Sequence, residues 1–472
     1  MKINKLIIEN FKTFSTKEEF DFNCNLIFLV GENNTGKTTV LEAIAYLIEG
    51  PDKDKKYKNS KCSENDEITI EAEIMCDPAS LVGDLKKYED YVINGDKLHI
   101  KRSTKKETVS QKGKDVSLDE SKIQIYNPTT LQFENPTGKD TTFRSLFEPV
   151  FIWSDVTPKD VIDFGSTKIL GKLVSSYARD FFSSPLYKDF EAQRHRVFQE
   201  DENSLAKKLE NLGTEITTVF NDQYGDAKIE FNFGAIDAGS YTKTGKLVID
   251  ENDDREELAY KGSGMQRSIA LSVIQLFSNI SSSTDTGKII LCIDEPELSL
   301  HPIAQEKLIQ SLLKLSQNVQ IFITTHSPNI LKNFKSAHNK LYIFSKKSPR
   351  FKLIDELGLI KWGPTLSEVN YFAYNLYSKE LFSDLYAYLE YLVIDQNLAE
   401  NGEKYLRDTK GKNQVSYVKL KNDGTTSNEQ WTELSIMRHK IHHQENRHNS
   451  ELTEQELIQG IEELVSFVRE LV

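Results

Sequence analysis

Residues 31 to 38, Gly-Glu-Asn-Asn-Thr-Gly-Lys-Thr, have the spacing GxxxxGK[ST] of a phosphate-binding loop. The glycines let successive backbone N–H groups turn toward a β-phosphate, Lys37 reaches the β/γ oxygens, and the Thr38 hydroxyl can ligate Mg²⁺. An apolar run before the loop and an amphipathic segment after it indicate strand, loop and helix, which favours an ATP and Mg²⁺ site over a chance match. The residues expected at the nucleotide are Gly31, Asn33, Asn34, Gly36, Lys37, Thr38 and Thr39.

Two adjacent carboxylates follow a second apolar run. Residues Ile289 to Ile293 are typical of a buried strand, and Asp294 and Glu295 come directly after it. Asp294 suits Mg²⁺, directly or through water, and Glu295 suits activation of the attacking water. Another strand ends at His326, where an imidazole can sense the γ-phosphate. We therefore expect Glu295, Lys37 and His326 to be catalytic, with Thr38 and Asp294 at the metal.

A third candidate site lies at the start of a helix. Gly262, Ser263 and Gly264 precede apolar positions that recur at helical spacing from Ile269 to Ile280. Small residues at a helix N-terminus are typical of an anion site, so these three are expected to contact nucleotide as well.

The histidines concentrate near the end of the chain. Four of the nine lie between residues 439 and 448, where Arg438 and His443 have the spacing R-x4-H. A polar contact surface is one interpretation of this segment. Another is a Zn²⁺ site on His439 and His443, which would share one helix face.

Periodicity divides the 472 residues into several parts. Strand-like and helical segments alternate at the start, helical periodicity dominates from about residue 159, strands return later, and aromatic-rich helical stretches follow. The long stretch from Ser367 to Asp395 is expected to be helical, and residues 400–428 to be a polar loop or insertion. We predict an α/β ATPase core split by a helical insertion, plus a C-terminal α-helical domain. Its boundaries are 1–158 for the N-terminal half of the core, 159–225 for the insertion, 226–350 for the C-terminal half and 364–472 for the helical domain.

The composition limits the kinds of partner that the chain is expected to bind. A net charge of −13 argues against a chain that coats nucleic acid, although a local contact through the lysine-rich segment from Lys97 to Lys114 stays open. No apolar run approaches the roughly eighteen residues that suggest a bilayer span, so no membrane partner and a cytoplasmic location are expected.

The order of these motifs resembles the ABC-type ATPases of the SMC, RecF and OLD group. The resemblance covers about residues 1 to 345, and the segment Asn10-Phe11-Lys12 is similar to the group's opening strand. In that group two heads enclose two ATP molecules, which implies a head-to-head homodimer or a higher even oligomer. The resemblance makes Glu295 the general base and His326 the switch histidine. It also makes residues 299–301 the D-loop and residues 262–266 the signature, although the usual signature serine is replaced here by Gly262, with Ser263 one place later. Three residues are candidates for the Q-loop glutamine at the metal: Gln111, Gln124 and, preferred, Gln132.

The tail departs from the OLD pattern. OLD-type nucleases continue into a TOPRIM domain that needs an Asp-x-Asp pair, and no such pair follows His326. A separate nuclease effector is therefore the expected partner. The tail instead resembles HEPN ribonucleases, in which the arginine and histidine of R-x4-H would be catalytic, here Arg438 and His443.

Together these features resemble the ATPase subunits of the Septu, retron and PARIS antiphage systems, of the PtuA or AriA kind. That resemblance implies an ATP-hydrolysing sensor or regulator that controls a separate nuclease by ATP-dependent head dimerisation. Two alternatives remain: a self-contained toxin with a ribonuclease tail, and a RecF- or SMC-like DNA-repair ATPase.

Overall fold

The computed structural model describes the chain apart from a set of short segments. The segments left out are residues 82, 112, 137–146, 155–158, 166–167, 197–203, 224–227, 229, 231–243, 252–253, 282–287, 299, 332–333, 335–337, 347–349 and 422–423. The described residues form two compact units, 1–155 with 285–472, and 156–284.

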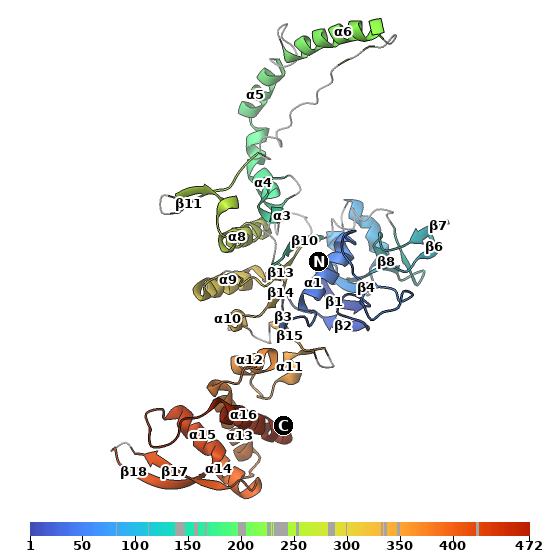
Figure 1. The fold of residues 1–472 in the computed structure, drawn as a ribbon. Helices are drawn as coiled ribbons and strands as arrows, with labels where there is room; N and C mark the ends of the chain where they lie inside the picture. The colour runs from blue at the N-terminus through green and yellow to red at the C-terminus, as the bar shows by residue number, and fades with distance from the viewer. Residues whose placement is uncertain are drawn as a thin grey trace. The chain divides into compact units, whose positions relative to one another are not determined.

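The first unit contains two six-stranded sheets (Figure 1). One sheet is antiparallel, in the order β2-β1-β4-β5-β8-β9. Its strands are β1 (Lys2–Glu9), β2 (Glu18–Asp21), β4 (Thr69–Met75), β5 (Lys97–Ser103), β8 (Gln124–Asn127) and β9 (Gln132–Glu134). Beside it are the 3-10 helices η1 (Pro78–Ser80) and η2 (Gly83–Tyr91) and the hairpin β6 (Glu107–Gln111) and β7 (Lys114–Leu118).

The other sheet has the order β10-β13-β14-β3-β15-β16, and it is parallel except for its last strand. Its strands are β3 (Leu26–Gly31), β10 (Phe147–Ile152), β13 (Lys288–Asp294), β14 (Gln320–Thr325), β15 (Asn339–Phe344) and β16 (Phe351–Leu353). The helices that accompany it are α1 (Lys37–Glu49), α9 (Pro302–Leu315), α10 (Pro328–Leu331) and α11 (Ile354–Leu357). Strands β3 and β14 are buried along their whole length, as central strands of a parallel sheet should be.

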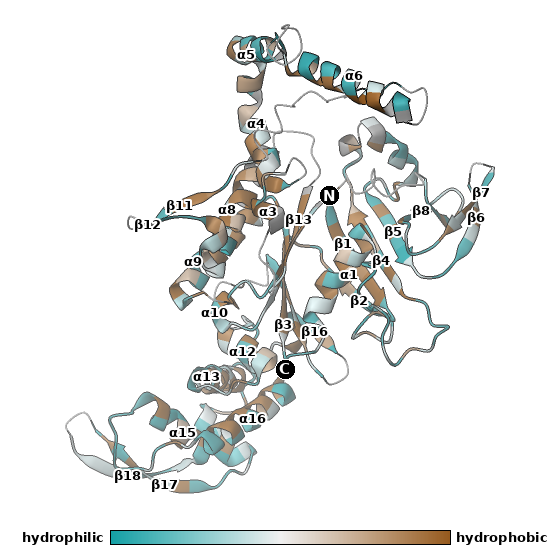
Figure 2. Ribbon diagram, turned by 45° about the horizontal axis from the view of Figure 1, so that its top comes forward, coloured by the Kyte–Doolittle hydropathy of each residue, from teal (hydrophilic) through white to brown (hydrophobic). Residues whose placement is uncertain are grey.

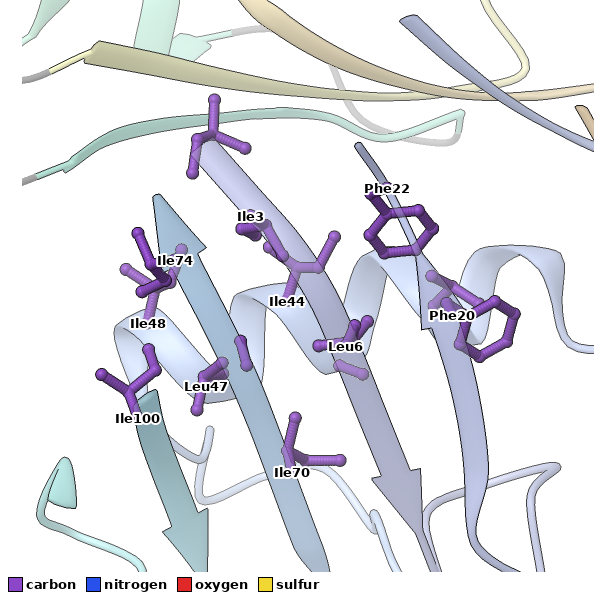
Figure 3. Packing of buried hydrophobic residues seen from close by; sticks show 14 of the residues in the cluster. Ile3, Leu6, Phe20, Phe22, Ile44, Leu47, Ile48, Ile70, Ile74 and Ile100 are labelled. Atoms are coloured by element: carbon purple, nitrogen blue, oxygen red, sulfur yellow. The ribbon is translucent and has the colours of Figure 1, made fainter. Parts of the chain in front are cut away.

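Helix α1 joins the two sheets into one core. Its residues Ile44, Leu47 and Ile48 are fully buried against side chains of β1, β4 and β5 (Figure 3). The same apolar cluster includes Leu29 of β3 and Phe322 of β14, so α1 contributes to the packing of both sheets. The loop before α1 is thereby attached to a rigid helix.

The C-terminal part of the first unit has its own apolar cluster. Its elements are α12 (Leu366–Tyr374), α13 (Lys379–Asp395), α14 (Gly402–Lys404), the π-helix η5 (Tyr405–Thr409), β17 (Gln414–Leu420), β18 (Thr426–Thr432), α15 (Glu433–His442) and α16 (Glu454–Leu471). Helix α13 packs against α15 and α16.

Two features of this region differ from expectation. The stretch from Ser367 to Asp395 is two helices, because Asn375 adopts a left-handed conformation (φ 53°) at the end of α12 and Ser378 caps the start of α13. Residues 400–428, expected to be a loop or insertion, include α14, η5 and strand β17, which pairs with β18 as a hairpin.

The second unit is mainly helical. Its elements are α3 (Lys159–Ile162), α4 (Ile169–Ser183), α5 (Pro185–His195), α6 (Leu205–Gln223), the hairpin β11 (Val248–Glu251) and β12 (Asp254–Glu257), η4 (Leu258–Tyr260) and α8 (Ser263–Ser281). Helix α6 carries both apolar and polar residues along its length (Figure 2).

The predicted α/β architecture, with a largely helical second unit and a predominantly helical C-terminal region, is therefore confirmed. Among the helices in the described ranges, none has the length and apolar character needed to cross a membrane.

Candidate nucleotide-binding site

The phosphate-binding loop connects β3 to α1. Its backbone uses conformations that favour glycine, with φ 128° at Gly31 and φ 115° at Gly36. A side chain on Gly31 would meet the Phe344 carbonyl oxygen of β15 at 2.1 Å. Asn33 and Asn34 are exposed at the tip of the loop, and Thr39 is buried in the first turn of α1, where it accepts a hydrogen bond from Thr13. The loop is therefore held from behind by β15 and by the turn after β1.

The Lys37 ammonium lies inside this loop. Only 5% of the residue is exposed, and Nζ donates to the carbonyl oxygens of Gly31 (3.1 Å) and Glu32 (2.6 Å). Burial lowers the pKa of Lys37 to about 8, and the carboxylates of Glu295 and Asp294 oppose that shift. Lys37 thus occupies a place where additional negative charge, such as phosphate, would restore its ordinary pKa.

Asp294 is the centre of a hydrogen-bond network that draws on three parts of the chain. Its Oδ1 accepts from the hydroxyls of Thr38 (2.8 Å) and Thr324 (2.6 Å), and its Oδ2 accepts from the Ser154 hydroxyl (2.9 Å). The sheet order explains this convergence: β14 lies between β13 and β3, and Thr324 is paired with Asp294 in the ladder. Carboxyl ends of parallel strands meet at one edge, where ligands commonly bind.

This donor set fits Mg²⁺. The Thr38 hydroxyl and the Asp294 carboxylate supply the oxygen ligands that a hard cation prefers. In the part of the chain that the structure describes, no group of three His, Cys, Asp or Glu side chains could hold a metal. A Mg²⁺ ion usually keeps several waters and binds substrate phosphates, so one or two protein oxygens are sufficient.

Glu295 follows Asp294 in a left-handed conformation, with φ 48°. Its N–H is fixed by both the carbonyl and the hydroxyl of Thr324 (3.1 and 3.0 Å), and its Oε1 lies 3.5 Å from Nε2 of His326. Burial, and then the Lys37 charge, lower the pKa of His326, which favours a neutral imidazole. Such positive φ values in non-glycine residues are costly and concentrate at functional sites.

A second glutamate, Glu297, holds the backbone at His326 by hydrogen bonds. It is 8% exposed, and its Oε1 accepts from the Thr325 hydroxyl and from the His326 N–H, both at 2.7 Å. Sequence reasoning missed Glu297, and it also missed Thr324 and Ser154. The Pro-Glu that follows Asp294 and Glu295 was visible, but nothing local connects it with His326.

The structure places Gln132 elsewhere. It lies exposed on β9, the edge strand of the antiparallel sheet, where it is paired with Asn127. The strand whose end does meet Asp294 is β10, through Ser154. Among the described residues, no contact joins Gln132 with Thr38 or Asp294, so its assignment as a metal residue finds no support in the geometry.

The signature candidates belong to the second unit. Helix α8 begins at Ser263, so Ser263 and Gly264 lie in its first turn, where backbone N–H groups lack intrahelical acceptors. Gly262 and Ser263 are exposed, whereas the buried Gln266 donates to the Lys261 carbonyl (2.8 Å). Of the D-loop candidates, Ser299 lies outside the described residues and His301 caps α9.

The tail residues have separate partners. Arg438 pairs with Glu390 of α13 (3.1 Å) and lies over the Tyr386 ring. His443, just after α15, contacts Glu445 (3.0 Å), and its ring is stacked 5.5 Å from that of His439. The stacked rings keep their nitrogens in parallel planes, which does not suit a shared Zn²⁺.

His439 belongs to an aromatic ladder between the hairpin and α15. Its ring lies 4.0 Å from Trp431, which in turn stacks on Tyr417. Burial lowers the pKa of His439 to about 4, so its imidazole is neutral. These contacts explain His439 as a packing residue.

Three lysines of the segment from Lys97 to Lys114 contact acidic or aromatic groups. Lys97 lies 3.6 Å from Glu73, Lys105 pairs with Glu107, and Lys101 lies over the Phe133 ring. A contact between this segment and nucleic acid stays a hypothesis.

Comparison with known families gives two matches, the second of which includes the segment predicted as the helical insertion. Residues 5–148 match the family model described as "AAA domain", and residues 153–331 match the one described as "AAA ATPase domain". Both contain parts of the site: the phosphate-binding loop lies in the first, and Asp294, Glu295 and His326 lie in the second.

Two curated relatives are similar over different lengths. The chain is 26% identical over 340 residues to the "Old nuclease" of Escherichia phage P2, a match that covers 67% of this chain and 55% of that protein. It is 30% identical over 97 residues to the "Retron Ec83 probable ATPase" of Escherichia coli, which covers 20% of this chain and 18% of that protein. The chain thus spans about half the length of the phage relative.

The chain is also similar to a solved structure of an SMC head, which is described as bound to the C-winged helix domain of ScpA. The match has a TM-score of 0.42 at 12% identity and covers 75% of this chain and 97% of that one.

Proposed function

Because the chain is an ABC-type ATPase of the group that includes the SMC, RecF and OLD proteins, we propose that it binds ATP with Mg²⁺ at this sheet edge and hydrolyses it. The observation that carries the proposal is the joining of Thr38, Asp294 and Thr324 by hydrogen bonds of 2.8 and 2.6 Å. The phosphate loop and the carboxylate strand are already in contact, as nucleotide chemistry requires.

Each residue of the site has a role that its position supports. Lys37 exchanges its loop carbonyl acceptors for phosphate oxygens, and the N–H groups of residues 33 to 39 cradle the β-phosphate. Mg²⁺ held by Thr38 and Asp294 would neutralise charge that develops on the phosphate oxygens. Glu295 accepts the proton of the attacking water, and His326, 3.5 Å away, donates to the γ-phosphate or orients that water.

A second copy of the chain completes the site in this proposal. Walker residues alone leave the γ-phosphate open to water on one side, and first-turn N–H groups at Ser263 and Gly264 of another copy could close it. The arrangement is isologous, so each copy both receives and supplies these groups. ATP then holds the two heads together.

An exposed apolar stripe on α6 also supports a second copy as partner. Leu205, Leu212, Ile216 and Val219 recur at helical spacing, and each is at least 38% exposed. Identical stripes on two copies are self-complementary. Replacement of both Leu212 and Ile216 by Gln should reduce self-association, whereas Thr214→Gln on the opposite face should not.

The decisive experiment is the mass in light scattering of the Glu295→Gln variant, which should bind ATP but hydrolyse it slowly. We expect the mass to double when Mg²⁺ and ATP are added. The matched control carries Lys37→Ala as well and should stay at its nucleotide-free mass. An unchanged mass for Glu295→Gln, under conditions where bound ATP is measured directly, would exclude the two-head arrangement.

Within this ATPase framework, we propose a regulatory role in prokaryotic antiphage defence. The support comes from similarity to a phage P2 nuclease and to a retron ATPase. The nuclease would be a separate protein, held or released according to the state of the heads. Expression with the neighbouring reading frames should yield a complex whose stability changes with ATP. Phage protection that is retained by the Glu295→Gln variant or without a partner protein would contradict this role.

A further inference from the structure

Glu297 is a buried charge that the proposed chemistry does not use. Its Oε1 accepts two hydrogen bonds from the end of β14, one from the Thr325 hydroxyl and one from the His326 backbone. Its Oε2 is buried and has no hydrogen-bond partner among the described residues. Burying a carboxylate is expensive unless its interactions compensate for lost hydration, so this arrangement suggests a function beyond packing.

The two accepted hydrogen bonds fix the local path of the chain at the switch histidine. The His326 N–H and the preceding Thr325 side chain are held by one oxygen atom, so backbone and side chain cannot move independently. Burial raises the pKa of Glu297, which marks the carboxylate as poorly solvated. Any shift of His326 toward a phosphate must therefore strain or rearrange these contacts.

The C-terminal region reaches the same point through Tyr374. This residue ends α12, and its hydroxyl lies 3.4 Å from the Thr325 carbonyl oxygen, a long hydrogen bond. Helix α12 also contacts β3, β15 and α10. Burial and then the Glu297 charge raise the pKa of Tyr374, so the phenol stays protonated and can donate. The free oxygen of Glu297 offers this hydroxyl a second acceptor if the loop shifts.

We propose that Glu297 is a positioning residue for His326 and that Tyr374 couples the end of β14 to the C-terminal region. The proposal rests on the ATPase function above, because ATP is the ligand that moves His326. Engagement of His326 by the γ-phosphate displaces the Thr325 carbonyl, and the Tyr374 hydroxyl follows or changes acceptor. Helix α12 carries that change to α13, which begins four residues after Asn375.

Hydrogen exchange of the full chain, with and without Mg²⁺ and a non-hydrolysable ATP analogue, tests the coupling. In the wild type we expect the analogue to alter exchange both in the phosphate-binding loop and in α12 and α13. Tyr374→Phe should keep the loop effect and lose the effect in α12 and α13 by about fivefold, as expected for one hydrogen bond of ordinary net strength.

Tyr371→Phe is the matched control. It makes the same chemical change one turn earlier on α12, where the hydroxyl bonds instead to Glu462 of α16 (3.1 Å). This variant should keep the wild-type response. An unchanged response in Tyr374→Phe, or equal losses in both variants, would overturn the coupling. Absence of any effect in the phosphate-binding loop of the wild type would instead overturn the ATP site, and the coupling with it.

Steady-state ATP hydrolysis tests the positioning role of Glu297. Glu297→Ala should lower kcat by about tenfold or more while the KM for ATP changes by less than about twofold, because a misplaced group weakens the transition state more than binding. Glu297→Gln retains an oxygen that can accept both hydrogen bonds and should restore most of kcat. An unchanged kcat in Glu297→Ala, or a Glu297→Gln variant as slow as Glu297→Ala, would overturn the assignment. If Glu297→Ala does not fold, Thr325→Val takes its place, because it removes one of the two donors to Glu297; it should lower kcat in the same way, and Thr325→Ser should not.

Discussion

The Thr38 hydroxyl donates a 2.8 Å hydrogen bond to Asp294, a residue 256 positions further along the chain. This bond joins the two residues that are proposed to hold Mg²⁺, so the phosphate-binding loop and the carboxylate strand fix each other's position. Such preorganisation leaves more of the binding energy of ATP for the steps that involve the γ-phosphate.

The Thr324 hydroxyl holds both the Asp294 carboxylate and the Glu295 backbone, so it should matter for hydrolysis. Thr324→Val keeps the shape but removes the donor to Asp294 and one acceptor of the Glu295 N–H. We expect kcat to fall about 10- to 100-fold, because small displacements of catalytic groups are costly, and stability to fall by about 1–2 kcal/mol. Thr324→Ser retains the hydroxyl and should hydrolyse ATP near the wild-type rate. Equal rates in Thr324→Val and wild type would remove Thr324 from the site.

ATP affinity should decrease at alkaline pH because of Lys37. In the free protein the pKa of Lys37 is lowered to about 8, and bound phosphate should raise it again. The protonated form binds phosphate, so affinity is constant below pH 8 and falls as pH rises above 8, by at most tenfold per pH unit. Titrations of an ATP analogue between pH 7 and 9.5 measure this, and Lys37→Arg should flatten the profile. A flat wild-type profile would contradict the lowered pKa.

Two glycine substitutions should differ in their effect on folding. Gly31→Ala forces a side chain into the Phe344 backbone at a positive φ, so we expect a loss of about 2 kcal/mol or more and no ATP binding. A side chain on Gly262 meets no described atom within 4 Å, so Gly262→Ala should fold normally. Thermal unfolding measures the loss of stability in Gly31→Ala. A loss of hydrolysis without loss of stability in Gly262→Ala would favour a nucleotide contact at the signature.

The ribonuclease alternative is best tested at His443. Its side chain is 54% exposed, so His443→Ala should leave the melting temperature unchanged. Arg438→Ala removes an ion pair and a cation–π contact and should lower stability by about 1 kcal/mol. A loss of activity in that variant is therefore explained equally by lost catalysis and by lost stability. Toxicity that disappears in His443→Ala, with ATP hydrolysis intact, would support RNA cleavage by the tail. Toxicity that persists would exclude His443 from such chemistry.

The parts of this protein that could be predicted from sequence are those with local signatures. The loop ending in Lys37 and Thr38 and the strand ending in Asp294 each combine a motif with an apolar run, and the ATPase core follows from them. Ser154 and Thr324 could not be found in this way, because a hydroxyl on a strand end has no distinctive spacing. Their roles depend on sheet order, which brings non-consecutive strands together.

The C-terminal region shows the same limit. Tertiary packing decides whether the segment around Asn375 forms one helix or two. One local hint of a break is that Asn tolerates the left-handed conformation better than most residues. The hairpin does have a local signal, since Asp423-Gly424 separates two runs with strand-forming residues.

Glu295 is held at φ 48°, a conformation that costs a residue with a side chain about 1–2 kcal/mol and costs glycine almost nothing. A glycine at this position would relax the backbone and remove the proposed base in one step. The substitution at residue 295 that costs the fold least is therefore one that abolishes ATP hydrolysis. Selection for thermal stability alone would be expected to lose ATP hydrolysis at residue 295, and screens for robust variants of this protein should be read with that trade-off in view.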